Sequence, residues 1–117
     1  MHIEEFRTYC LSKPGTSEDL PFDETTLVFK VCDKIFAITG IDTFEGINLK
    51  CDPERAIELR EQYDGVQPGY HMNKKHWNTV STDGSVNDQL IIELIDHSYD
   101  MVVKGLSKKL RESLKEL

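Results

Sequence analysis

Every second residue from Leu27 to Val31 is large and apolar, and this alternation predicts a β-strand over residues 26–31. Val28 and Lys30 then lie on the opposite face from Leu27, Phe29 and Val31. Further strands are expected over residues 34–39, 47–50 and 76–82. Residues 16–25 are polar and predict a loop or a short edge strand. Residues 66–72 contain a Pro-Gly pair, so we expect a turn that continues as a strand.

Four other segments place apolar residues at helical spacing. The first covers residues 2–13, and the second opens at Asp52, which can cap the free amides ahead of a proline. The longest is expected to begin at Ser85, with Asp88 three residues on in a capping-box arrangement, and the last opens at Ser107. The predicted buried positions are Ile3, Phe6 and Cys10; Ala56, Leu59 and Tyr63; Ile91, Leu94, Ile95, Ser98, Tyr99, Val102 and Val103; and Leu110, Leu114 and Leu117.

Short connections between neighbouring strands imply antiparallel pairing. The order of elements therefore predicts an α+β fold with an antiparallel β-sheet and helices flanking it. The length of 117 residues suits a single domain over residues 1–117. Only Cys32 and Asp33 separate two of the strands, although such tight turns prefer Asn-Gly or Gly-Gly because the central residues need positive φ. This turn is either looser than usual or mildly strained.

The formal net charge of −7 limits the partners that the whole surface can attract. Residues 1–64 carry the entire excess of acids, whereas acids and bases balance in the remainder. Residues 65–82 contain no acid but hold Lys74, Lys75 and two histidines. We therefore expect nucleic acid to be repelled by the protein as a whole and attracted only by a local surface.

The chain has the features of a cytoplasmic protein. No stretch approaches the roughly 18 consecutive apolar residues that a membrane span needs. The acidic start of the chain, residues 1–6, lacks the apolar run of a secretory signal. Cys10, Cys32 and Cys51 are odd in number and form no CxxC pair, so reduced thiols and a cytoplasmic location are expected.

Three stretches make the chain similar to a known family. The most specific is the long run of unusual residues 68–80, PGYHMNKKHWNTV. Residues 21–31, PFDETTLVFKV, and residues 48–54, NLKCDPE, carry the similarity further, and residues 98–100 and 103–106 extend it towards the C-terminus. In these stretches the chain resembles the MmcQ/YjbR family. The resemblance implies a compact α+β fold with a double-wing motif and a DNA-binding role, although the chain departs from the family's glycine-rich turn at Cys32-Asp33.

The hairpin around residues 73–75 is the candidate nucleic-acid site. A wing needs cations at its tip to meet phosphates, and hydrogen-bonding side chains nearby to meet sugars or base edges. Lys74 and Lys75, with Lys50 on a neighbouring strand, are expected to contact phosphates. Asn73, His76 and Asn78 are expected to contact the groove or the sugars. The competing interpretation is a solvated turn whose polarity protects the hairpin from aggregation.

Other functions for the same region remain open. Trp77 could stack on bases, but an alternating strand must bury one face, so we expect Trp77 in the core. His71 and His76 flank the tip and could bind a metal with a third ligand such as Cys51, which no sequence spacing identifies. The alternative to DNA is a small anionic ligand or a protein partner on the same polar face, formed by Asn48, Lys50, His71, His76 and Asn78.

No motif supports catalysis or a cofactor. The sequence contains no nucleophile elbow, no phosphate-cradling glycine loop and no paired-carboxylate motif, so we expect neither an enzyme nor a cofactor or metal. The C-terminal segment carries a second basic cluster, which Glu112 and Glu116 interrupt. We expect it to be an amphipathic helix docked on the domain, with a solvated charged face. If it lies beside the hairpin, it could instead add phosphate contacts. The bases of this cluster are Lys104, Lys108, Lys109, Arg111 and Lys115.

Overall fold

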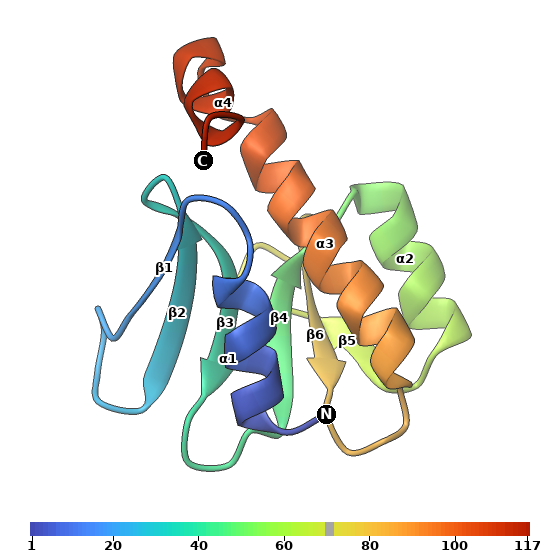
Figure 1. The fold of residues 1–117 in the computed structure, drawn as a ribbon. Coiled ribbons are helices and arrows are strands. Elements are labelled where there is room, and N and C mark those ends of the chain that lie inside the picture. The colour runs from blue at the N-terminus through green and yellow to red at the C-terminus, as the bar shows by residue number, and fades with distance from the viewer. Residues whose placement is uncertain (70–71) are drawn as a thin grey trace.

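In the computed structural model, which describes residues 1–69 and 72–117, six strands form one fully antiparallel sheet (Figure 1). Their order across the sheet is β1-β2-β3-β4-β6-β5. The predicted α+β class, with an antiparallel sheet and flanking helices in a single compact unit, is confirmed. The strands are β1 (Thr16–Asp19), β2 (Thr26–Val31), β3 (Lys34–Gly40), β4 (Gly46–Lys50), β5 (Val66–Pro68) and β6 (Trp77–Ser81).

Four helices complete the described part of the chain: α1 (Ile3–Leu11), α2 (Pro53–Gln62), α3 (Asp88–Lys104) and α4 (Lys108–Leu114). Asp52 and Ser107 cap α2 and α4 as predicted, because each side chain accepts a hydrogen bond from a free amide of the first turn. The predicted start of α3 at Ser85 is wrong. Asn87 is the cap, since its side chain accepts from the Leu90 amide at 2.8 Å. No helix of the described residues is long and apolar enough to cross a membrane.

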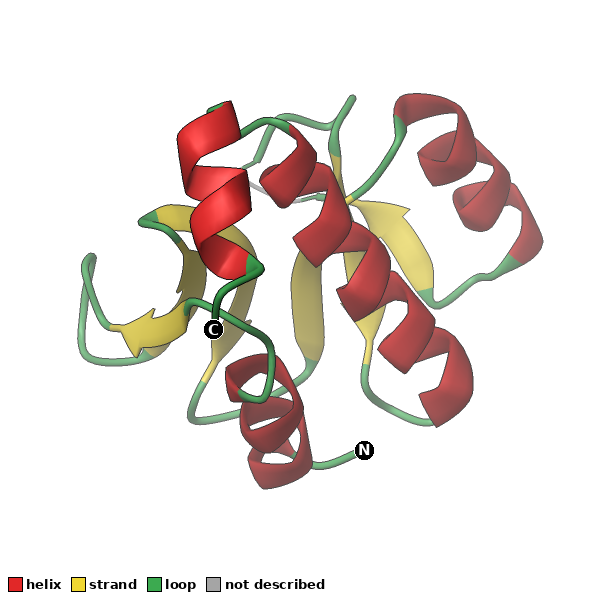
Figure 2. Cartoon of the chain, turned by 45° about the horizontal axis from the view of Figure 1, so that its top comes forward, coloured by secondary structure: helices red, strands yellow, loops and turns green. Residues whose placement is uncertain are grey.

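The helices lie on one side of the sheet, and the other side is open (Figures 1 and 2). The strand register gives each face a row of residues. One row runs through Phe29, Ala37, Leu49 and Asn78, and its apolar members belong to the core beneath the helices. The adjacent row, on the open face, runs through Val28, Ile38, Asn48 and Thr79. The alternation predicted for residues 26–31 is therefore confirmed.

Tyr99 and Ser98 of α3 contact the middle of the sheet. A register shift beside Phe29 leaves Phe36 without a pairing partner on β2. The ring of Phe36 packs edge-on against the ring of Tyr99, with 5.5 Å between the two centroids. The fully buried Ser98 hydroxyl donates to the Phe36 carbonyl at 2.6 Å. The Ser98 hydroxyl oxygen also accepts a hydrogen bond from the Lys50 amide at 2.9 Å. Ser98 thus satisfies two backbone groups that the irregular strands leave over.

Of the two alternatives left open for the Cys32-Asp33 turn, the structure has the strained one. The Cys32-Asp33 turn is tight and strained, because the two residues have φ of 49° and 66°, a region in which residues other than glycine are uncommon. Strand β5 ends at Pro68 and does not follow the Pro-Gly pair, and the remainder of the expected strand includes residues 70–71, which lie outside the described part of the chain. Residues 16–19 form the short edge strand that was one of two alternatives.

Candidate nucleic-acid interface

Lys50 and Trp77 form a cross-strand pair on the open face of the sheet. Lys50 is the last residue of β4, Trp77 is the first of β6, and the register places them directly opposite each other. Both side chains are half-buried. Side chains at such a position lie about 5 Å apart at Cβ. A cation and a partly exposed aromatic ring therefore share one surface at this end of the sheet.

The loop that carries Lys74 and Lys75 closes immediately before Trp77. The Asn73 carbonyl accepts from the His76 amide at 3.1 Å and from the Trp77 amide at 2.9 Å, and the Asn73 side chain accepts from the Lys75 amide at 3.0 Å. These bonds form a tight turn in which Asn73, Lys74 and Lys75 are exposed. Both lysine side chains therefore remain in solvent next to the Lys50–Trp77 pair.

Arg60 of α2 fixes this loop to the domain. Its guanidinium donates to the Asn78 side-chain oxygen at 2.7 Å, to the Lys74 carbonyl, and to the Trp77 carbonyl at 3.3 Å. All three acceptors are neutral, so the bonds hold the guanidinium without cancelling its charge. Arg60 therefore adds a positive charge beside Lys74. Nothing in the sequence indicates this role, because Arg60 reads as one charged residue of a helix rich in charges.

Asn78 does not fit the role predicted for it. The residue is 2 % exposed and points to the helix-covered side of β6. Its side chain accepts from Arg60 and donates to the Ala56 carbonyl at 3.4 Å. A buried amide with these partners cannot reach a groove or a sugar. Asn78 instead positions Arg60, and so acts on the surface from beneath.

The expectation that Trp77 is a core residue is also wrong. The alternation in β6 buries Asn78 and Val80, which places Trp77, Thr79 and Ser81 on the open face. Along this face Thr79 donates to the Asn48 side chain at 2.5 Å, so the row next to Trp77 is polar and hydrogen-bonded. Trp77 is thus available to a ligand on the open face of the sheet.

The alternatives of a metal site and a small-ligand pocket gain little support here. Within residues 1–69 and 72–117 no group of three histidine, cysteine or acidic side chains could hold a metal, and His71 lies outside the described residues. The cavity beside Lys50 and Asn78 measures about 10 Å³, which is too small for more than a water molecule. Lys50 and His76 do not meet in that cavity, whose lining does not include His76.

All three cysteines are free thiols, and two of them are buried. Cys10, Cys32 and Cys51 are all free, as expected. Burial raises the pKa of the Cys10 thiol to about 12 and that of Cys51 to about 11. Because the thiolate is the reactive form of cysteine, burial lowers the reactivity of these two thiols at neutral pH.

An antiparallel sheet with helices on one face and a basic loop at the end of its open face defines the class of this protein. It is an α+β domain in which helices cover one face of the sheet and leave the other face uncovered. A family model described as YjbR matches residues 11–101. The chain is 38 % identical over 118 aligned residues to the uncharacterized protein YjbR of Escherichia coli strain K12, and the alignment covers all of both chains.

Solved structures show the same fold. The crystal structure of Deinococcus radiodurans protein DR2400 matches with a TM-score of 0.89 and 43 % identity, covering 96 % of this chain and 86 % of that one. A crystal structure of a Pseudomonas syringae protein matches with a TM-score of 0.73 and 32 % identity, covering 86 % of this chain and 98 % of that one. The chain belongs to the YjbR family, which confirms the resemblance found in its sequence.

Proposed function

We propose that this protein binds DNA through the surface formed by Lys50, Asn73, Lys74, Lys75, His76 and Trp77, called here the Lys50–Trp77 surface. The observation that carries the proposal is the pairing of Lys50 with Trp77 on the uncovered sheet face, next to two exposed lysines. Lysines contact phosphates, and a partly exposed indole can stack on an unpaired base. The surface therefore favours a DNA end or single strand over an intact duplex.

The charge distribution sets the expected strength. The chain as a whole carries −7, so attraction comes only from the local bases, to which Arg60 contributes because its bonds go to neutral acceptors. A contact with few phosphates has low affinity and a shallow dependence on salt. We expect binding at low ionic strength that weakens as salt is added.

The test is fluorescence anisotropy with a labelled random single strand and the matching duplex, measured across a salt series. In Lys74→Gln/Lys75→Gln, the slope of log affinity against log salt should become shallower by about 1.4, since each lost single-strand phosphate contact removes about 0.7. Lys104→Gln/Lys109→Gln removes the same charge from two exposed lysines outside the surface and should preserve the slope.

Trp77 supplies a second readout, because it is the chain's single tryptophan. Stacking of a base on its ring should quench the intrinsic fluorescence as the single strand is added. No binding at low salt, or equal losses in both double variants, would show that the Lys50–Trp77 surface is not a DNA site.

A further inference from the structure

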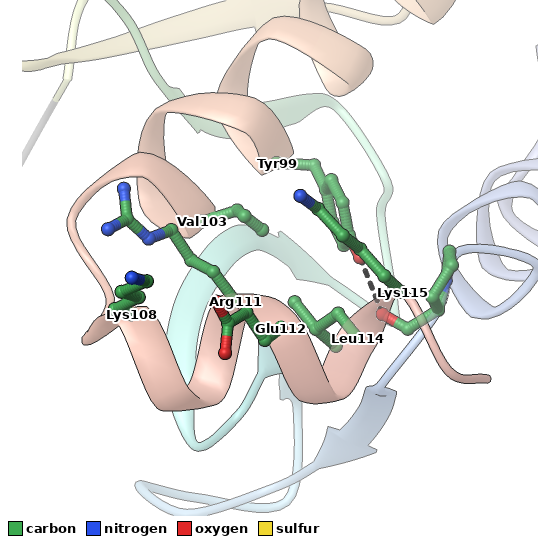
Figure 3. A pocket seen from close by; sticks show the side chains of 8 residues that line it. Tyr99, Val103, Lys108, Arg111, Glu112, Leu114 and Lys115 are labelled. Carbon is green, nitrogen blue, oxygen red and sulfur yellow. Dashed lines mark hydrogen bonds between the residues drawn. The ribbon is translucent and has the colours of Figure 1, made fainter.

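A pocket of about 570 Å³ lies on the helix side of the molecule, between α3, α4 and Pro14 (Figure 3). Its floor is apolar and consists of Pro14, Tyr99, Val103 and Leu114. Tyr99 and Leu114 are each 8 % exposed, so they form a fixed surface. The Tyr99 hydroxyl donates to the Pro14 carbonyl at 2.6 Å, and this bond leaves the floor without a free polar group from tyrosine.

The rim of the pocket is basic. Lys108, Arg111 and Lys115 line it with a single acid, Glu112. In Figure 3, Lys108 and Arg111 lie on one side of the apolar floor, and Lys115 extends past Tyr99 on the other. Among the described residues these three bases make no ion pair.

The charge of this region contrasts with the rest of the chain. Residues 104–117 hold five bases and two acids in a protein of net charge −7. Lys13 also lies 5.0 Å from the centre of the Tyr99 ring, but it forms an ion pair with Asp96 at 2.5 Å and its charge is already balanced. The excess positive charge thus belongs to the C-terminal segment, residues 104–117.

Helix α4 is docked by a specific contact, so the pocket is a built feature. Gly15 has a φ of 72°, and the absence of a side chain there leaves room for the buried Leu114. Ser107 caps the helix by accepting from the Leu110 amide at 3.3 Å. Leu110 and Leu117, expected to pack beside Leu114, are instead 40 % and 79 % exposed. Leu114 alone of the three leucines anchors the helix, and the space left beside it is the pocket.

We propose that this pocket binds small amphipathic carboxylates, with the apolar body on Tyr99, Val103 and Leu114 and the carboxylate between Arg111 and Lys115. The volume falls within the roughly 300–1,000 Å³ of small-molecule sites, which combine apolar walls with a few placed polar groups. An arginine fork matches a carboxylate in geometry as well as charge. A neutral apolar ligand would cover the cations without pairing them, and a polyanion would leave the apolar floor unused.

The site is separate from the Lys50–Trp77 surface. Lys50 and Trp77 occupy the open face of the sheet, whereas Tyr99 and Val103 belong to a helix on the covered side (Figure 1). Failure of either proposal therefore leaves the other standing.

The experiment is a titration of the isotope-labelled full chain with octanoate, followed by amide chemical shifts, with octanol and octylammonium as ligands of matched apolar length. Saturable shifts are expected around Tyr99, Val103 and Leu114. Arg111→Gln/Lys115→Gln should weaken octanoate binding by about tenfold or more, because it removes both cations that pair with the carboxylate.

Lys104→Gln/Lys109→Gln is the matched control, because it removes the same charge from exposed residues that do not line the pocket. It should change the affinity by less than about twofold. The proposal is overturned if octanol binds as well as octanoate, if the shifts lie elsewhere, or if both double variants lose binding equally.

Discussion

Replacing Ser98 with alanine should destabilise the protein far more than the loss of one oxygen atom suggests. The Ser98 hydroxyl is fully buried and bridges the Phe36 carbonyl on β3 and the Lys50 amide at the end of β4. In Ser98→Ala both backbone groups stay beneath α3 and lose the partner that this hydroxyl provides. The variant therefore tests whether α3 holds the two strands through this side chain.

The magnitude follows from these two contacts. A buried polar group that loses its partner costs about 1–3 kcal/mol, and two such groups give a loss of about 2–4 kcal/mol in the free energy of unfolding, allowing for partial relaxation. Ser113→Ala is the matched control, because that hydroxyl is exposed and donates to the Leu110 carbonyl of its own helix. It should cost less than about 0.5 kcal/mol.

Urea unfolding followed by circular dichroism, at constant m-value, measures both variants. Because the Lys50 amide is one of the two orphaned groups, amide exchange at Lys50 should also accelerate in Ser98→Ala. A Ser98→Ala variant within about 0.5 kcal/mol of the parent would refute the reasoning. It would mean that the strands keep their geometry without the bridge.

Three further changes test other parts of the structure. Burial, and to a smaller extent the charge of Arg55, lower the pKa of His97 from its ordinary 6.5. Folding therefore favours the neutral ring, which accepts a hydrogen bond from the Asp52 amide at 3.1 Å. The contribution of His97 to stability should therefore be full above pH 6.5 and fall as the pH drops through that value. In His97→Gln, whose side-chain oxygen also accepts a hydrogen bond, the urea midpoint should change less with pH between pH 5.5 and 8. Cys32→Asn with Asp33→Gly should raise the free energy of unfolding by about 1 kcal/mol, because the native turn holds both residues at positive φ; an unchanged or lowered melting temperature would contradict this. Gly15→Ala should cost about 1–3 kcal/mol, because its φ is 72° and the added methyl group would collide with the buried leucine of α4, and the amide shifts of α4 should move together if the helix undocks.

The elements themselves were largely readable from the sequence. Period-two alternation fixed the faces of β2, and the helical spacing placed Ser98 correctly among the buried residues of α3. Asp52 and Ser107 were identifiable as caps because capping depends on a side chain and the next few amides. Asn87 was missed as the cap of α3 because Ser85 offered an equally good local pattern, and only packing decides between two such starts.

The candidate site was predicted in part. The exposed Asn73, Lys74 and Lys75 were placed in a loop before β6 by turn residues and charge, which are local properties. The contributions of Arg60 and of the Lys50–Trp77 pair depend on long-range contacts. Arg60 and Asn78 are separated by 18 positions in the chain, and Lys50 and Trp77 by 27. No pattern within a short window contains them.

Sequence alone therefore determined which segments alternate, where most helices begin and which family the chain belongs to. The tertiary structure decided which face of each strand is covered. In β6 the alternation shows that two faces differ, and hydrophobicity favours Trp77 as the buried member. The helix layer instead buries Asn78, because Arg60 and the Ala56 carbonyl satisfy its amide there. Burial of a polar group depends on partners that only the folded chain brings within reach, and this exchange leaves the indole on the open face.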